Sequence, residues 1–163
     1  MLHATGEAYL WYFRDGSPAT KEASTSPEAY PTDAWGTSAM AGALIQGLAG
    51  VRSGRPGFVA AWLEPHWRSA GINSAEVTLQ YPSSGKTFLY TYEYDPVNYL
   101  TELIIEPDRL ESLHVGFPET VTEAEAEIDG RPVEVKIENW ELGKGTVFRD
   151  TITGTLRIRY REG

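Results

Sequence analysis

Residues 123–138 read E-A-E-A-E-I-D-G-R-P-V-E-V-K-I-E, and this stretch decides the fold. Apolar and charged side chains alternate on both sides of Asp129-Gly130. A period of two places successive side chains on opposite faces of a strand, and Asp-Gly between two such runs is a strong signal for a hairpin turn. The stretch therefore predicts an antiparallel hairpin with one apolar and one charged face, although Arg131-Pro132 leaves a longer turn open.

The same alternation recurs through the last two thirds of the chain. Together with the hairpin it gives about eight predicted strands, separated by turn residues such as Pro82-Ser83-Ser84-Gly85. Regular spacing of this kind is typical of an antiparallel β-sandwich or jelly roll and not of βαβ units. The predicted strands outside the hairpin are 58–63, 76–81, 88–94, 99–106, 113–117 and 156–161.

The faces of these strands can be assigned from their residues. The glutamates at 123, 125 and 127 form one face, which we expect to be solvated and opposite the arginines at 157, 159 and 161 on a neighbouring strand. Tyr90, Tyr92 and Tyr94 share a face that we expect to fill the sandwich interior. The unbroken apolar run 103–105 indicates a central strand that is buried on both faces.

The chain has a different character before Gly50. Apolar and small residues between 34 and 49 predict a helix that Thr32 or Asp33 caps and Gly50 ends. Its glycines and alanines favour close packing against a neighbour, and a loosely ordered Gly-rich loop is the alternative.

The domain organisation follows from this change. Residues 1–50 are predicted to hold an aromatic segment, a loop and the Gly/Ala-rich helix, and residues 51–163 a β-sandwich domain. The aromatic segment 7–13 is apolar on every face, so it fits either a buried helix end or a central strand. We expect the two parts to form one compact unit. The fold class is therefore mainly β, with an N-terminal helical segment.

Composition limits the possible partners. The 163 residues carry 14 Lys+Arg against 23 Asp+Glu, a formal net charge of -9, so we expect neither nucleic acid nor an anionic membrane surface as a partner. We expect no membrane segment and no signal peptide, which fits a soluble, untargeted chain or a processed piece. The compartment stays open, because a chain without cysteine shows no redox preference.

The residues suggest no catalytic group, metal ligand or cofactor site. Three histidines far apart and the absence of cysteine do not fit a metal site, and we find neither a GxSxG elbow nor a phosphate-binding loop. The glycines at 143 and 145 are taken as turns. Many carboxylates are available for glycoside hydrolysis, but the sequence does not single out a pair.

Aromatic side chains are the more informative candidates. Trp62 and Trp67 flank Glu64-Pro65-His66, where the chain leaves a predicted strand. Flat aromatic rings can stack on the C–H face of a sugar, and they can equally pack in the core. We treat both residues as candidates for carbohydrate binding and leave packing open as the alternative.

Residues 33–51, D-A-W-G-T-S-A-M-A-G-A-L-I-Q-G-L-A-G-V, resemble the last barrel helix of (α/α)6-barrel glycoside hydrolases, which leads into a C-terminal β-sandwich. Gln46 stands where the corresponding phrase often carries Glu. Residues 61–67, A-W-L-E-P-H-W, look like the first sandwich strand of those proteins, and residues 113–119 and 128–133 look like their closing strands.

The resemblance implies an accessory role. In such enzymes the catalytic acid and base belong to the barrel, for which a chain of 163 residues has no room. It also places Asp33 and Trp35 where barrel-rim residues lie, which adds them to the candidates for carbohydrate binding. The expected function is a non-catalytic sandwich domain that supports a catalytic barrel and lines its carbohydrate cleft.

Two other functions stay open. The chain could be an independent carbohydrate-binding module that uses exposed aromatics, or a complete small enzyme that acts on polysaccharide. Without a barrel, the apolar face of the 34–49 helix needs cover, so we expect the catalytic barrel domain or a second copy of the chain as a partner.

Overall fold

The computed structural model describes Arg14, Ser17 and residues 34–81, 83–141 and 143–162, and of residues 34–37 only the helical backbone. The predictions for residues 7–13 and for the capping residues Thr32 and Asp33 lie outside this part. The chain divides into two units, residues 1–44 and 45–163. The boundary predicted at Gly50 and the single compact unit stay predictions.

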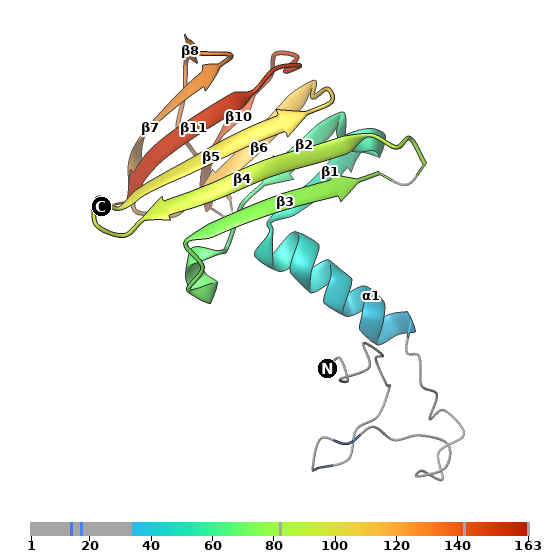
Figure 1. Ribbon diagram of the computed structural model, residues 1–163. Helices are drawn as coiled ribbons and strands as arrows, with labels where there is room; N and C mark the ends of the chain where they lie inside the picture. The colour runs from blue at the N-terminus through green and yellow to red at the C-terminus, as the bar shows by residue number, and fades with distance from the viewer. Residues whose placement is uncertain (1–13, 15–16, 18–33, 82, 142, 163) are drawn as a thin grey trace. The chain divides into compact units, whose positions relative to one another are not determined.

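The second unit holds two β-sheets that face each other as layers, with the six-stranded sheet in front in Figure 1. The mainly β sandwich with an N-terminal helical segment is confirmed; the finer prediction of a jelly roll stays a prediction. The five-stranded sheet has the order β1 (Val51–Arg55), β2 (Ala60–Leu63), β6 (Ser112–Phe117), β10 (Gly143–Phe148), β9 (Glu138–Trp140). The six-stranded sheet has the order β3 (Ser74–Gln80), β4 (Thr87–Asp95), β5 (Leu100–Pro107), β11 (Leu156–Glu162), β7 (Val121–Ile128), β8 (Arg131–Val133).

Three of the eleven strands in the described residues, β1, β9 and β10, were not predicted. Gly143 and Gly145 lie in β10, so the prediction of a turn there was wrong. Two glycines conceal this strand, because they carry no side chain that could show a period of two. One pair of strands, β2 and β6, is parallel, whereas the other pairs within the two sheets are antiparallel. The segment 61–67 holds the second sandwich strand, β2, and not the first.

The hairpin that decides the fold is present with its tight turn. Asp129 and Gly130 both have positive φ, 49° and 76°, and Ile128 pairs with Arg131. This is the backbone that a two-residue turn of type I′ requires. The return strand β8 ends at Val133, so the alternation at residues 134–137 does not continue the strand.

Strand register places the charged faces as predicted. Arg157, Arg159 and Arg161 of β11 pair with the glutamates at 127, 125 and 123 of β7. On the other side of β11 lies β5, an inner strand of its sheet. Its residues Leu103 and Ile105 are fully buried, whereas Ile104 is half-buried.

The core lies between the two sheets. Tyr90 and Tyr92 are buried there, as predicted, and Tyr94 packs against the same cluster. Both sheets contribute aliphatic side chains, for example Leu63 and Val115 from one and Leu103 and Ile158 from the other. The described residues of both sheets therefore build one apolar core between them.

The predicted helix is present as α1 (Ala34–Gly42) followed by a π-helical segment, η1 (Ala43–Leu48). Gly50 then turns the chain into β1 with φ +70°, and a Cβ there would lie 1.8 Å from the carbonyl oxygen of Glu64. Two further short helices, η2 (Pro56–Phe58) and η3 (Arg68–Ala70), flank β2. In the described part of the chain no helix is both long and apolar enough to cross a membrane.

Candidate functional site

The four predicted carbohydrate-binding residues do not form one described site. Asp33 lies outside the described residues, and Trp35 is placed only by its backbone, in α1. Trp62 belongs to β2, and Trp67 lies just before η3. Neither tryptophan has a described contact with the other, and their roles in carbohydrate binding stay predictions.

Trp67 is engaged in packing. Its Nε1 donates a hydrogen bond to the Tyr90 hydroxyl at 2.8 Å, and its ring packs against the core. The Tyr90 hydroxyl donates in turn to the Ala49 carbonyl oxygen at 2.6 Å. Trp67 therefore ties the segment after β2 to β4 and to the residue before Gly50.

Trp62 lies between two neighbours on the outer face of the five-stranded sheet. Its ring stacks on His114 of β6, with centroids 4.8 Å apart and 24° between the planes. On the other side a Cβ at Gly54 of β1 would lie 2.2 Å from Cζ3 of the indole. Because β2 separates β1 from β6, both sides of Trp62 are in contact with the protein.

Beyond His114 lies Trp140 of β9. Its ring centroid is 6.0 Å from that of His114, with 58° between the two ring planes. Burial, then the charge of Arg149, lowers the pKa of His114. We call Trp62, His114 and Trp140 the aromatic row. The sequence could not show it, because three strands far apart in the chain bring it together.

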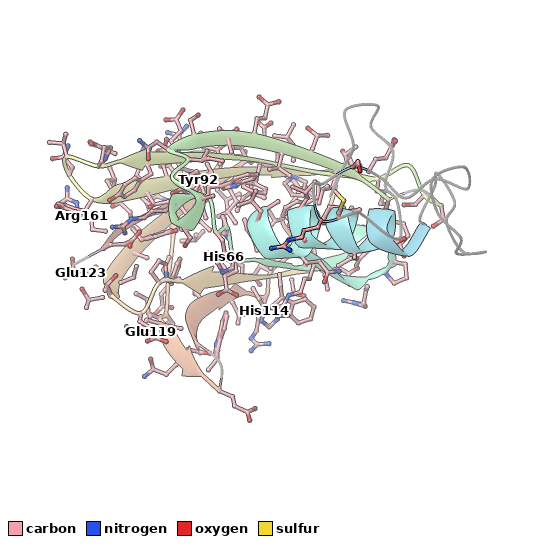
Figure 2. The ribbon with its side chains drawn as sticks, turned by 90° about the horizontal axis from the view of Figure 1, so that it is seen from below. His66, Tyr92, His114, Glu119, Glu123 and Arg161 are labelled. Carbon is pink, nitrogen blue, oxygen red and sulfur yellow. The ribbon has the colours of Figure 1, made fainter. Side chains whose placement is uncertain are left out.

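A second site lies at one end of the sandwich, and we call it the end cleft. It has a volume of about 440 Å³ and is open to solvent. The segment after β2, with η3, forms one wall, and residues of β4, β6 and β11 form the others, so both sheets contribute. The lining residues are Glu64, Pro65, His66, Arg68, Ser69, Tyr92, Gly116, Phe117, Pro118, Tyr160 and Glu162. Figure 2 labels His66 and Tyr92 in this region.

The charged groups of the end cleft are largely paired. The Glu162 side chain is only 9% exposed, and its Oε2 accepts a hydrogen bond from Nη1 of Arg68. The Arg68 guanidinium also lies over the Tyr94 ring, 4.8 Å from its centroid. Glu64 is half-exposed, with Oε1 3.8 Å from Nε2 of His66. A buried carboxylate with an arginine partner is held in one position, which suits recognition of a ligand.

Two tyrosines of the six-stranded sheet also line the cleft, Tyr92 of β4 and Tyr160 of β11. Burial raises the pKa of both Tyr92 and Tyr160 above the usual value of a phenol. Their hydroxyls are therefore neutral at physiological pH and can both donate and accept hydrogen bonds. Tyr92 is buried in the core as predicted, and it also lines the cleft, which local patterns cannot show because two sheets meet there.

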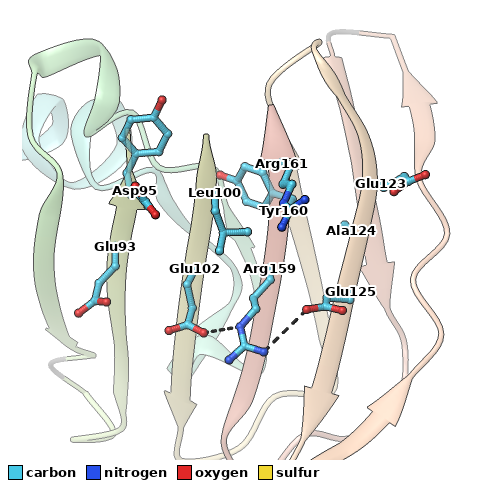
Figure 3. A pocket seen from close by; sticks show the side chains of 11 residues that line it. Glu93, Asp95, Leu100, Glu102, Glu123, Ala124, Glu125, Arg159, Tyr160 and Arg161 are labelled. Carbon is cyan, nitrogen blue, oxygen red and sulfur yellow. Dashed lines mark hydrogen bonds and ion pairs between the residues drawn. The ribbon is translucent and has the colours of Figure 1, made fainter. Parts of the chain in front are cut away.

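A third site is an open hollow of about 760 Å³ on the outer face of the six-stranded sheet (Figure 3). Its centre is Arg159, whose Nε donates to Glu102 at 2.6 Å and whose Nη1 lies 3.7 Å from Glu125. These charges satisfy one another across β5, β11 and β7. The arrangement fits the solvated charged face that the sequence predicts.

Among the described residues, no group of three or more His, Asp or Glu is arranged to hold a metal ion. The end cleft does bring two carboxylates, Glu64 and Glu162, into one cavity. Glu162 is already engaged with Arg68, so hydrogen bonding to a ligand is the chemistry that the geometry supports best.

Among known proteins, the chain is similar to parts of solved structures. No family model matches the chain. No curated protein matches it. One similar structure is an α-L-rhamnosidase from Dictyoglumus thermophilum, with a TM-score of 0.47 and 20% identity over 71% of this chain. Another is a GH127 β-L-arabinofuranosidase from Geobacillus stearothermophilus T6, with a TM-score of 0.43 and 15% identity over 63% of this chain. The chain covers 12% and 15% of those two glycoside hydrolase chains, and it is similar to that short part of each.

Proposed function

We propose that this chain is an accessory β-sandwich domain that supports the catalytic barrel of a glycoside hydrolase. The observation that carries the proposal is the junction at Gly50. A helical segment, 34–48, leads through two residues into β1, and it exposes Leu44 (56%) and Ile45 (38%). This is the order of elements that the resemblance of residues 33–51 implies.

The exposed residues favour a partner on the helical segment. Leu44 and Ile45 are adjacent, and apolar side chains grouped in this way mark a contact surface more often than isolated ones do. Neither is among the core residues of the sandwich. The expected occupant is the barrel domain, because in the resembled proteins this helix is the last one of the barrel.

The accessory role can be tested on the gene and on the protein. We expect the coding frame upstream, or a neighbouring gene, to encode several hundred residues with the helix pattern of a barrel. A barrel chain produced separately should associate with this chain in analytical ultracentrifugation, and a Leu44→Gln/Ile45→Gln variant should associate less. The chain alone should not hydrolyse aryl glycosides.

Two results would contradict the accessory role or its barrel partner. Hydrolysis of a glycoside by the purified chain, lost in a Glu64→Gln variant, would replace the accessory role with that of a small enzyme. Association of the chain with itself through Leu44 and Ile45, unaffected by the barrel, would make a second copy the partner.

An independent carbohydrate-binding module is the second candidate, and the aromatic row favours it. Trp62 and Trp140 lie on one outer face, as a sugar-binding surface requires. However, Trp62 has His114 on one side and Gly54 on the other, so the row does not offer a flat, continuous platform. Glycan binding that Trp140→Ala abolishes would support this second function.

A further inference from the structure

We propose that the end cleft binds a neutral sugar residue. The proposal does not rest on the accessory role, because binding can be measured on this chain with no barrel present. It concerns residues that were not predicted to bind a ligand, chiefly Glu64, His66, Arg68, Tyr92 and Glu162.

The cleft has the size and rigidity of a small-molecule site. Its volume of about 440 Å³ lies within the range of roughly 300–1,000 Å³ typical of ligand pockets. Tyr92, Phe117 and Tyr160 in its lining are buried members of the sandwich core. The cleft is thus formed before a ligand arrives, which reduces the entropy lost on binding.

The lining suits a molecule that is polar at its edges and apolar on its faces. Pro65, Phe117 and Pro118 provide apolar surface. Carboxylate, imidazole and guanidinium groups in the same cleft provide acceptors and donors. A pyranose ring matches this mixture, because its C–H faces are apolar and its hydroxyls both donate and accept.

Arg68 is positioned to hold such hydroxyls. The pair with Glu162 engages Nη1, and a guanidinium carries five N–H donors in a rigid fork. The Glu162 side chain is only 9% exposed and pairs with the guanidinium, which also lies over the Tyr94 ring. The Arg68 side chain is 43% exposed, so the donors that Glu162 does not engage can reach a ligand.

The charged groups of the cleft favour a neutral ligand over an anion. The lining contains two carboxylates, Glu64 and Glu162, and a single arginine that one of them already pairs. A phosphate or a uronic acid would meet excess negative charge and no free cation in this lining. A neutral sugar meets no such repulsion, and Glu64 can accept hydrogen bonds from two of its hydroxyls.

The test is titration of the ¹⁵N-labelled chain with methyl β-D-glucoside, methyl β-D-galactoside and methyl β-D-xyloside. We expect at least one of them to bind with a Kd on the order of 1 mM, as suits a ligand of this size. The shifted amide signals should belong to His66, Arg68, Ser69, Gly116 and Phe117. Signals of Trp62 and Trp140 should stay unchanged.

Two variants keep the test independent of folding. His66→Ala and Glu64→Gln change half-exposed side chains, so we expect both to fold, and each should weaken binding about tenfold through a lost hydrogen bond. Glu134→Gln, on an exposed glutamate outside the cleft, is the matched control and should bind like the parent chain. A Glu162→Gln variant should also lose binding, with its fold checked by its amide spectrum.

Three results would overturn the proposal. The first is the absence of shifts at tens of millimolar of every neutral glycoside. The second is shifts centred on His114 and Trp140, which would assign the sugar to the aromatic row. The third is tighter binding of methyl β-D-glucuronide than of the glucoside, which would make the ligand an anion. None of these results bears on association with a barrel, so the two proposals fail separately.

Discussion

The Tyr90 hydroxyl lies between Trp67 and Ala49: it accepts a hydrogen bond from the indole Nε1 at 2.8 Å and donates one to the Ala49 carbonyl at 2.6 Å. This buried link joins β4, the segment after β2 and the residue before Gly50. Burial raises the pKa of Tyr90, so the hydroxyl keeps the proton that it donates. The link therefore holds the segment after β2, which forms one wall of the end cleft, next to the residues that lead into β1.

Removing this hydroxyl should destabilise the sandwich. A Tyr90→Phe variant leaves the Trp67 N–H and the Ala49 carbonyl without their partner, which should lower the free energy of unfolding by about 1–3 kcal/mol. Urea denaturation followed by tryptophan fluorescence measures the change. Tyr99→Phe, at an exposed tyrosine, is the control and should have little effect. Equal stability of the two variants would contradict the link.

The close approach of Trp140 to Gly145 should not tolerate a methyl group. A Cβ at Gly145 would lie 2.3 Å from both Cη2 of Trp140 and the Val115 carbonyl oxygen. Gly145→Ala should therefore lower the free energy of unfolding by about 1–3 kcal/mol, measured by thermal denaturation. Gly42→Ala, in α1 with open space around it, should instead raise helix content slightly. A neutral Gly145→Ala variant would show that the indole is not held there.

The exposed pair on the helical segment should control association rather than folding. Leu44→Gln/Ile45→Gln should reduce the fluorescence of a dye that binds exposed apolar surface, because it removes the two side chains from that surface. The melting temperature of the sandwich should stay the same, since neither residue is in the core. Val97→Gln, on a single exposed valine, is the control. Unchanged dye binding in the double variant would leave the helical segment without a contact role.

His114 should make the sandwich less stable in mild acid. Its pKa is lowered in the folded protein by burial and by Arg149, so the unfolded chain binds the proton more readily. Stability then falls as the pH drops below about 6.5, the value of a free histidine, and through the folded pKa. Urea denaturation at a series of pH values measures this slope. His114→Gln should flatten it, and an unchanged slope in that variant would contradict the role of His114.

The fold could be predicted where side chains alternate, and not where they are absent. The hairpin around Asp129-Gly130 and the pairing of residues 76–80 with 87–91 follow from local patterns, which need only a strand and a turn. Strand β10 was missed because Gly143 and Gly145 hide its period. Strand β9 is too short, at Glu138–Trp140, to show any period at all.

The candidate sites show the limit of such patterns. Trp62 and Trp67 are five positions apart and were equal candidates for carbohydrate binding. Trp62 stacks on His114 at the outer face of its sheet. Trp67 instead packs against the core and donates a hydrogen bond to Tyr90. Which side a residue faces follows from strand alternation, but which residues surround it follows from sheet order. The parallel pairing of β2 with β6, on which the contact of Trp62 with His114 depends, has no local signal.

The sequence by itself determined the mainly β class, the helix before Gly50 and the opposed glutamate and arginine faces, because these depend on side-chain periods along a few residues. Only the tertiary structure decided the two sheet orders, the aromatic row and the end cleft. Those features bring Glu64, Tyr92 and Glu162 together from three distant segments. Their meeting depends on how the sheets pack around one core, which is a property of the whole chain.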